Sequence, residues 1–379
     1  MTPVDLRSYL RHLDYIVLLA AAGLLAYGVA MIYFATRHDV GTSPLYYARY
    51  QIAYAAVGIV ALVGLSLLDY EHYRRWQWPL YAFALVSIAA VFALGPVTRG
   101  SRRWLTLPFV RFQPSELALV ILTVTLAAFL SDRLQLIGLR RMTLYALAYM
   151  AVPAALVFGQ PDLGTAMVFL ILMLTLLLFY GTPWTHFAVL LGAAVALAVV
   201  VLKVLPMAGV RLVHAYQMQR LFVFLHPGHD VQSTGYNLTQ SLIAVGSGAF
   251  SGRGNQATQT VLDFLPEHHT DFIFAVIGER YGFVGAAVLL ALFIVLIWRA
   301  LRIATISRDL LGSMIAGCIA AIFLFEVFVN IGMTIGIMPI TGIPLPFVSY
   351  GGAALITDLM LVGLLESVHL RGRLAESGG

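Results

Sequence analysis

Charge and cysteine are both scarce in this chain of 379 residues. Only 11% of the residues are charged and 60% are hydrophobic, whereas an average soluble domain is about 25% charged. A soluble domain cannot hide so much apolar surface, because its outside must face water. The composition therefore argues against soluble enzymes, nucleic-acid-binding modules and disordered chains. A single cysteine, Cys318, excludes an intramolecular disulfide framework and a cysteine-based metal cluster.

The apolar residues form long continuous runs instead of alternating with polar ones, which argues against an outer-membrane barrel. At roughly 20 apolar residues per crossing, the chain has room for about ten spans and one long loop. We therefore predict an all-α polytopic membrane protein with a single integral membrane domain over residues 1–379. The helices are expected at 14–36, 46–68, 78–95, 114–131, 142–159, 163–180, 186–205, 271–298, 311–337 and 350–369.

Arginine sets the expected orientation, because short cytoplasmic loops carry an excess of basic residues. The net charge is +5, and Lys203 is the single lysine among the 23 basic residues. With a cytoplasmic N-terminus, the inner segments hold Arg7, Arg11, Arg74, Arg75, Arg133, Arg140, Arg141, Arg299, Arg302, Arg308, Arg371 and Arg373.

Two predicted outer segments break this rule, which suggests that their arginines have a role beyond orientation. A guanidinium fork binds phosphate oxygens in bidentate fashion, as an amphiphile with a diphosphate headgroup would require. These arginines are Arg99, Arg102, Arg103 and Arg111 in residues 96–113, and Arg211, Arg220 and Arg253 in residues 206–270.

The predicted outer loop, residues 206–270, is too long to be a mere connector. Its first part, residues 210–227, has apolar residues at helical spacing, which predicts an amphipathic helix at the membrane interface. The second part is rich in glycine, but no GK[ST] follows, so a phosphate-cradling loop is disfavoured. Flexible turns between short helices are the favoured interpretation.

Asp271 follows His269 and Thr270 at the start of the eighth predicted span. Carboxylates are costly in lipid and tend to mark functional sites. An acid in a first helical turn is also stabilised by the helix dipole, so position alone does not decide between the two roles. The neighbours Glu267 and His268 add further polar side chains at the start of this span, which favours a functional role for Asp271. A metal site is disfavoured here, because no HxxxH or HExxH spacing occurs.

Residues 100–116 place arginines, a tryptophan and a glutamate at the same predicted outer surface. Trp104 is typical of an interfacial anchor, and we favour that role slightly over substrate contact. Glu116 lies just after a proline, and a helix start explains it about as well as catalysis does. Asp162 lies between Pro161 and Gly164, which favours an acid in a tight turn.

These segments together resemble one known family. The resemblance covers about residues 14–369, and its first two motifs look more like RodA members than FtsW members. The runs that resemble the signature blocks of the SEDS family (shape, elongation, division and sporulation) are RFQPSE at 111–116, QPDLGTA at 160–166, LPEHHTDFIFAVIGE at 265–279 and NIGMTIGIMPITGIPLPFVSYGG at 330–352.

The resemblance implies a glycosyltransferase that polymerises lipid II, the lipid-linked disaccharide precursor of peptidoglycan, during cell elongation and rod-shape maintenance. It implies a multi-pass protein of the cytoplasmic (inner) membrane with cytoplasmic termini and an active site at the outer face. The expected partners are a class B penicillin-binding protein, which supplies transpeptidation, and other membrane proteins of the elongation complex. Nucleic acid is not expected.

Asp271 is implied as the essential acid, and we expect it to act as general base on the acceptor sugar hydroxyl. Outer arginines would stabilise the polyprenyl diphosphate that leaves, and a divalent cation is a candidate for sharing that role. One well-placed carboxylate predicts inversion in a single displacement. The substrate-binding candidates are Trp104, Arg102, Arg103, Arg111, Gln113, Glu116, His269, Thr270 and Ser349.

The chain departs from the family pattern at two places. Family members usually carry lysine three residues after the glutamate of the PSE run, but Leu119 stands there, so the expected salt bridge of Glu116 cannot form locally. The family often reads SYGGSS where this chain reads SYGGAA at 349–354. Ala353 and Ala354 therefore lack the hydroxyl groups that the serines would supply.

Other functions remain open at this level. A flippase or transporter of the same lipid precursor would also suit ten spans and a broken connection near residue 340. An FtsW-like division paralogue and a non-catalytic scaffold for a penicillin-binding protein are further alternatives. We also predict an ion pair between Arg280 and Glu326, because simple helix geometry puts these opposite charges at similar depth on consecutive spans.

Overall fold

The computed structural model describes residues 6–37, 43–96, 102–106, 111–209, 215–225, 234–261 and 264–377. Within these residues, ten helices are long and apolar enough to cross a membrane, so the predicted all-α fold class is confirmed. The helices are α2 (Tyr15–Thr36), α3 (Tyr46–Leu67), α5 (Gln77–Leu94), α6 (Pro114–Ser131), α7 (Arg140–Gly159), α8 (Leu163–Tyr180), α9 (Trp184–Val199) continuing through η2 (Val200–Val204) and α10 (Leu205–Met207), α14 (Ile273–Thr305), α15 (Leu310–Thr334) and α16 (Gly352–Ser377).

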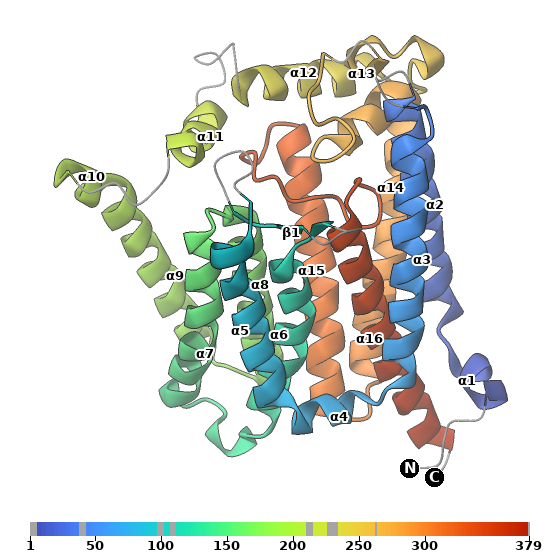
Figure 1. Ribbon diagram of the computed structural model, residues 1–379. Helices are drawn as coiled ribbons and strands as arrows, with labels where there is room; N and C mark the ends of the chain where they lie inside the picture. Colours follow the sequence, from blue (N-terminus) through green and yellow to red (C-terminus); the bar gives the residue numbers. More distant parts are fainter. Residues whose placement is uncertain are drawn as a thin grey trace.

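Short elements cover the two ends of the helix bundle (Figure 1). Helices α1 (Leu6–His12) and α4 (Tyr70–Arg75) lie at one end, which we call the α4 end. At the opposite α12 end lie α11 (Ala215–Leu225), α12 (Thr234–Ser247) and α13 (Thr258–Val261). The remaining short elements are η1 (Leu134–Leu136), η4 (Gly254–Gln256) and the antiparallel pair β1 (Leu105–Thr106) and β2 (Arg111–Phe112).

Local signals explain where the helices begin and end. The carboxylates of Asp14, Asp162 and Asp309 stand at the N-caps of α2, α8 and α15, where each accepts hydrogen bonds from backbone N–H groups of the first turn. Pro114 is suited to the start of α6, where no N–H donor is needed. Gly181 ends α8 with a left-handed φ of 89°. These residues explain why the predicted helix starts agree closely with the observed ones.

Burial separates central helices from peripheral ones. Within the apolar windows of α6 and α16, 83% of the residues are buried, whereas none is buried in the window of α9. Helices α6, α15 and α16 pack against one another, and α3, α5, α8 and α14 pack around them. Figure 1 shows α9 at the side of the bundle. Because the exposed side chains of α9 are apolar, lipid is the solvent that suits them.

The glycine-rich segment of the long loop packs against the start of α14. Helix α14 is interrupted at Gly282, where φ is 60° and ψ is −151°. The backbone N–H groups of Phe283 and Val284 donate there to the carbonyls of Ala249 and Phe250, at 2.9 and 3.2 Å. A Cβ added at nearby Gly248 would lie 1.8 Å from the carbonyl oxygen of Gly278, so only glycine permits this approach. The segment therefore forms a packed turn.

The predicted ion pair between Arg280 and Glu326 is wrong. Nη2 of Arg280 donates to Oδ1 of Asn255 at 2.7 Å, and its guanidinium carbon lies 4.0 Å from the ring centroid of Phe34. Similar depth was not enough to predict contact, because the interruption at Gly282 and the packed loop give Arg280 partners outside α15.

We predict that Gly248→Ala lowers the stability of the protein by about 1–3 kcal/mol, because the new methyl group must displace backbone atoms of α14. Thermal unfolding of the purified protein in detergent measures this loss. Gly246→Ala is the matched control, since nothing lies within 4 Å of its added Cβ. Equal unfolding temperatures for the two variants would contradict the packing role of Gly248.

Candidate active site

Asp271 lies immediately before α14, and its backbone is fixed by a side chain from α15. Nδ2 of Asn330 donates to the carbonyl oxygens of Asp271, at 3.0 Å, and Ile343, at 2.8 Å. Asn330 is fully buried, so loss of these bonds would leave two carbonyls without that donor. One amide group thus ties Asp271 to the connection between α15 and α16.

The same connection also holds the two residues that precede Asp271. Oγ of Ser349 donates to the carbonyl of Thr270 at 2.6 Å and accepts from the N–H of Leu345 at 2.8 Å. The N–H of Tyr350 donates to the carbonyl of His269 at 2.9 Å. Ser349 therefore acts in this structure as a brace for the Asp271 segment.

Two buried polar side chains hold the turn that carries Ser349. Phe347 has a φ of 62°, a left-handed conformation that is costly for a bulky residue. Its N–H donates to Oδ2 of Asp358 at 2.8 Å. Gln51 donates from Nε2 to the carbonyl of Ser349 at 3.1 Å, and its Oε1 accepts from the N–H of Gly351 at 3.3 Å. Contacts from α3 and α16 therefore preserve a turn that would not be stable alone.

A guanidinium group shares the space beside the Asp271 carboxylate. Nη1 of Arg220, on α11, donates to the carbonyl of Thr341 at 3.1 Å. A Cβ added at Gly342 would lie 3.5 Å from Oδ2 of Asp271 and 3.6 Å from Nη1 of Arg220. Gly342 has a φ of 79°, which suits glycine and leaves this space open. The carboxylate of the candidate base and a guanidinium group therefore face the same open space at Gly342.

A second polar group surrounds Asp162 at the start of α8. Its Oδ1 accepts from the N–H of Thr165 at 3.3 Å and lies 3.6 Å from Nη1 of Arg103, while Oδ2 accepts from Nε2 of Gln113 at 3.2 Å. Arg103 also donates to the carbonyl of Pro161. Asp162 thus makes the local bond expected of a turn acid, and it also binds two of the predicted substrate-binding residues.

Contacts of α8 and α11 connect the residues around Asp271 with those around Asp162. Gln217, one turn before Arg220 on α11, donates from Nε2 to the carbonyl of Pro161 at 3.4 Å. A Cβ added at Gly164 would lie 3.0 Å from Cγ1 of Ile343, so the start of α8 touches the connection beside Asp271. The group of Asp162, Arg103 and Gln113 therefore lies next to the segment that carries Asp271 and Arg220.

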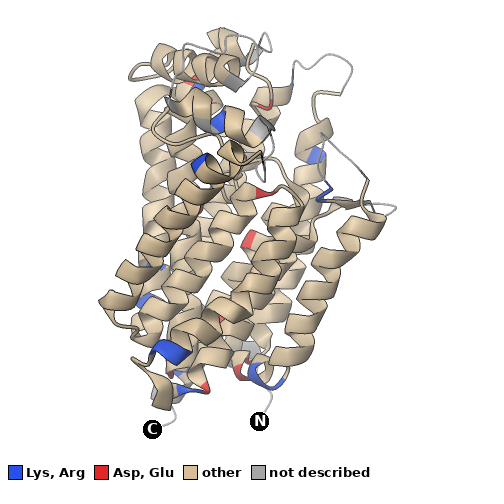
Figure 2. Ribbon diagram, turned by 90° about the vertical axis from the view of Figure 1, so that its left-hand side faces the viewer, with Lys and Arg blue, Asp and Glu red and all other residues tan. Residues whose placement is uncertain are grey.

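Glu116 has acidic neighbours where the family pattern would supply a lysine. It interacts electrostatically with Asp358 and Asp162, and Glu326 interacts with Asp358 and Glu116. Leu119 is buried, and no ion pair of Glu116 is found in the described part of the chain. Figure 2 shows acidic positions inside the bundle. Within the described residues, Glu116 therefore lacks the salt bridge of the family pattern and lies near other carboxylates instead.

The remaining residues of the segment 100–116 differ in their surroundings. Arg102 is exposed and donates from Nη1 to the carbonyl of Phe92 at 2.7 Å. Trp104 is half-buried and directly precedes β1. Arg111 lies in β2 and pairs with Thr106, and its side chain lies outside the described residues. Among the described side chains of this segment, Arg103 and Gln113 bind Asp162.

The other predicted residues beside Asp271, His269 and Thr270, contact α3, the loop itself and the connection after α15. The His269 ring lies 4.7 Å from the Tyr47 ring, measured between centroids. Oγ1 of Thr270 donates to Oε2 of Glu267 at 3.1 Å. Their backbone carbonyls, as described above, bind the connection after α15. The structure therefore places His269 and Thr270 next to Asp271 and shows them shaping its loop.

The described residues contain no group of three or more histidine, cysteine, aspartate or glutamate side chains arranged to hold a metal ion. Asp271 has an arginine beside it, which is a poor ligand set for a resident cation. A divalent cation at this place would need most of its ligands from a diphosphate. The divalent cation therefore stays a prediction about the complex with bound substrate.

Sequence analysis did not single out Asn330 or Gly342. A signal for Asn330 was present, because an amide within an apolar span is costly and tends to mark an important site. Gly342 offered no comparable signal, since glycine is common in turns and only the fold brings Asp271 and Arg220 to it. Arg220 was named only as one of several outer arginines, and its sequence distance from Asp271 hid the contact.

Comparison with known proteins agrees with this arrangement. A family model described as a cell cycle protein, covering FtsW, RodA and SpoVE, matches residues 14–373. The chain is 40% identical over 359 residues to the peptidoglycan glycosyltransferase MrdB of Escherichia coli strain K12, and the match covers 94% of each protein.

Two solved structures are similar over nearly their whole length. One belongs to a peptidoglycan synthase complex and has a TM-score of 0.81 at 29% identity, covering 95% of this chain and 98% of that one. The rod shape determining protein RodA of Thermus thermophilus has a TM-score of 0.68 at 27% identity, with 94% and 96% covered. With four motifs in order and these matches over almost the full chain, the protein belongs to the FtsW, RodA and SpoVE family of cell cycle proteins.

Proposed function

We propose that this protein is a peptidoglycan glycosyltransferase that polymerises lipid II during cell elongation. The observation that carries the proposal is the carboxylate of Asp271 held beside the guanidinium of Arg220 over Gly342. Membership of a family whose relative MrdB is named a peptidoglycan glycosyltransferase supports this activity. The similarity to a rod shape determining protein supports elongation over division.

Asp271 is the general base in this proposal. A hydroxyl oxygen of the acceptor sugar attacks the anomeric carbon of the donor and forms the new C–O bond, while its proton passes to the Asp271 carboxylate. The bond from the anomeric carbon to the diphosphate oxygen breaks in the same displacement, so the configuration at that carbon is inverted. Asn330 and Ser349 act as positioning residues, because they fix the backbone at Asp271 and Thr270.

Arg220 binds the polyprenyl diphosphate as it leaves and stabilises its growing negative charge. Arg103 is the second candidate, since its partner Asp162 lies at the start of α8 next to the same connection. Arg102, Arg111 and Trp104 stay candidates for substrate binding in our proposal. Arg253 has a different role, because it donates to Thr258 and its N–H binds the carbonyl of Glu279.

The protein spans the membrane several times, and we place it in the cytoplasmic membrane with the α4 end inside. Figure 2 supports this orientation, because basic positions gather at that end of the bundle. The active site then faces outwards. The similarity to a chain from a peptidoglycan synthase complex supports a class B penicillin-binding protein as partner.

A second candidate function, transport of the lipid precursor, is favoured by one observation. The carboxylates of Glu116, Glu326 and Asp358 interact with one another inside the bundle, and buried ionisable groups often mark transport pathways. Purified protein incubated with labelled lipid II in detergent separates the two functions. Glycan strands made without a partner or vesicles support polymerisation, whereas translocation in vesicles with no strands formed would support transport.

We predict that Asp271→Asn lowers the rate of glycan polymerisation by at least about a hundredfold, because it removes the base and keeps the shape of the side chain. The measurement is strand formation from lipid II by the folded, purified variant. Asp132→Asn is the matched control, since Asp132 follows α6 at the α4 end and pairs with Arg74. Wild-type polymerisation by Asp271→Asn would refute the assignment.

We predict that Arg220→Gln lowers kcat/KM for lipid II by at least about tenfold, because one charge-assisted contact to the diphosphate is lost. Rates measured over a range of lipid II concentrations test this effect. Arg253→Gln removes an exposed arginine from the same α12 end and should stay close to wild type. Equal losses in both variants would show that the general charge of this end, and not the position of Arg220, matters.

A further inference from the structure

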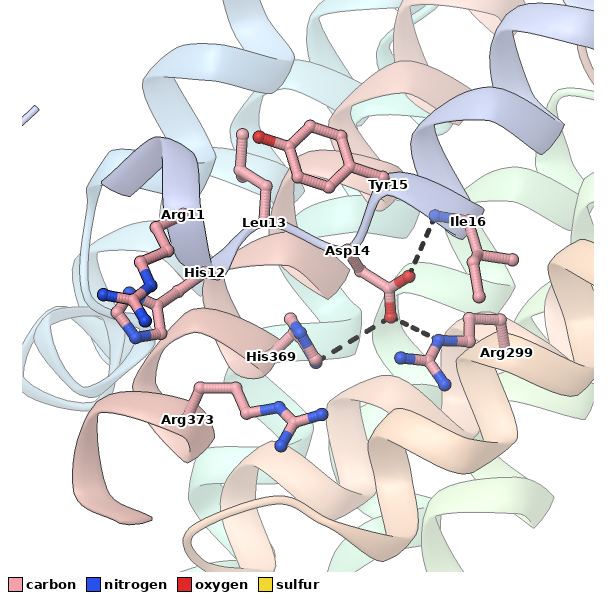
Figure 3. A pocket seen from close by; sticks show the side chains of 9 residues that line it. All are labelled: Arg11, His12, Leu13, Asp14, Tyr15, Ile16, Arg299, His369 and Arg373. Atoms are coloured by element: carbon pink, nitrogen blue, oxygen red, sulfur yellow. Dashed lines mark hydrogen bonds and ion pairs between the residues drawn. The ribbon is translucent and has the colours of Figure 1, made fainter. Parts of the chain in front are cut away.

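A cavity of about 360 Å³ lies at the α4 end, away from Asp271 (Figure 3). Its walls come from α1, from the first residues of α2, from α14 and from α16. Three arginines line it, namely Arg11, Arg299 and Arg373, together with His12 and His369. The proposed transferase reaction uses none of these residues, so this basic cavity needs a separate explanation.

Among the described residues, Asp14 is the only carboxylate that lines the cavity, and its oxygens are already engaged. Oδ1 accepts from the N–H groups of Ile16 and Val17, at 3.2 and 3.3 Å. Oδ2 accepts from Nε of Arg299 at 2.5 Å and lies 3.8 Å from Nδ1 of His369. Glu366 lies close by, because its Oε2 accepts from the N–H of Asp14 at 3.0 Å and it interacts electrostatically with Arg299. Within the described residues, two carboxylates thus lie next to the three arginines of this cavity.

The arginine side chains are placed to bind an anion between them. Nε of Arg299 is used by Asp14, but its two Nη groups make no hydrogen bond within the described part of the chain. Figure 3 shows the guanidinium groups of Arg299 and Arg373 pointing into the same space. Two guanidinium groups that converge in this way offer charge-assisted hydrogen bonds to a single anion.

The rim of the cavity is apolar, which distinguishes a lipid from a free anion. Tyr15 and Ile16 line the cavity and are 54% and 43% exposed. Further along the bundle, Leu19 on α2 and Ile294 and Trp298 on α14 are also exposed. Helices α2 and α14 pack side by side, so a basic cavity opens next to an apolar surface made by both.

We propose that this cavity binds the phosphodiester headgroup of an anionic phospholipid, whose acyl chains lie along α2 and α14. The arginines supply the charge-assisted hydrogen bonds that phosphate oxygens accept. The apolar rim supplies the surface that acyl chains cover. With the α4 end inside, the lipid belongs to the cytoplasmic leaflet, where anionic lipids attract basic residues. The site would tie the start of α2 to the end of α16 through a lipid.

Native mass spectrometry of the whole detergent-purified protein tests this proposal. The probes are phosphatidylglycerol and phosphatidylcholine with identical acyl chains. We expect wild type to bind phosphatidylglycerol at least about tenfold more tightly than phosphatidylcholine, and Arg11→Gln/Arg373→Gln to lose that preference. Arg11→Gln alone, a change at an exposed position, should show part of the loss and serves if the double variant does not fold.

The matched control is Arg75→Gln/Arg302→Gln, which removes the same charge from exposed positions of the α4 end outside the cavity. It should keep the wild-type preference. Equal retention of the two lipids by wild type, or equal loss in both double variants, would overturn the site. Inorganic phosphate is the third probe. If it displaces phosphatidylglycerol at equal concentration, the cavity takes a soluble anion and the lipid proposal is wrong.

Discussion

The buried amide of Asn330 is the contact on which the Asp271 site depends most. Its Nδ2 group uses its two protons on the carbonyls of Asp271 and Ile343, which belong to segments more than 70 residues apart in the chain. Oγ of Ser349 also joins the two segments, through Thr270 and Leu345, whereas Asn330 binds the backbone of Asp271 itself. Because Ile343 is next to Gly342, the same bond also sets the distance between the carboxylate and the glycine that leaves room for it.

The rest of the architecture can be understood as support for this junction. Asp358 holds the left-handed Phe347, and that turn presents Ser349 to the carbonyl of Thr270. On the other side, the packed turn around Gly248 fixes the start of α14. Helix α11 then places Arg220 next to Thr341 and Gly342. A flexible lipid substrate would thus meet groups that are already in place, which lowers the entropy cost of reaching the transition state.

The sequence predicted the helices well, because they depend on local information, and its choice of Asp271 as the reactive acid stays a prediction. Apolar run length and capping residues such as Asp14 and Asp309 set the helices, and Asp271 was recognised from its motif and its place at a span. Contacts between distant segments were harder. The prediction of an Arg280–Glu326 ion pair was wrong, because the depth of a residue in the membrane does not say which way its side chain points. The bonds of Asp162 to Arg103 and Gln113 were not predicted, because they depend on how the segments before α6 and α8 meet.

Our central claim is that the backbone contact from Asn330 positions Asp271 for catalysis. The most direct measurement is the kinetics of lipid II polymerisation by Asn330→Leu, which keeps the branching at Cγ and removes the donors. The account predicts that kcat falls by about a hundredfold, because a small displacement of a base costs that much, while KM changes little. A folded Asn330→Leu protein with the wild-type kcat would contradict it.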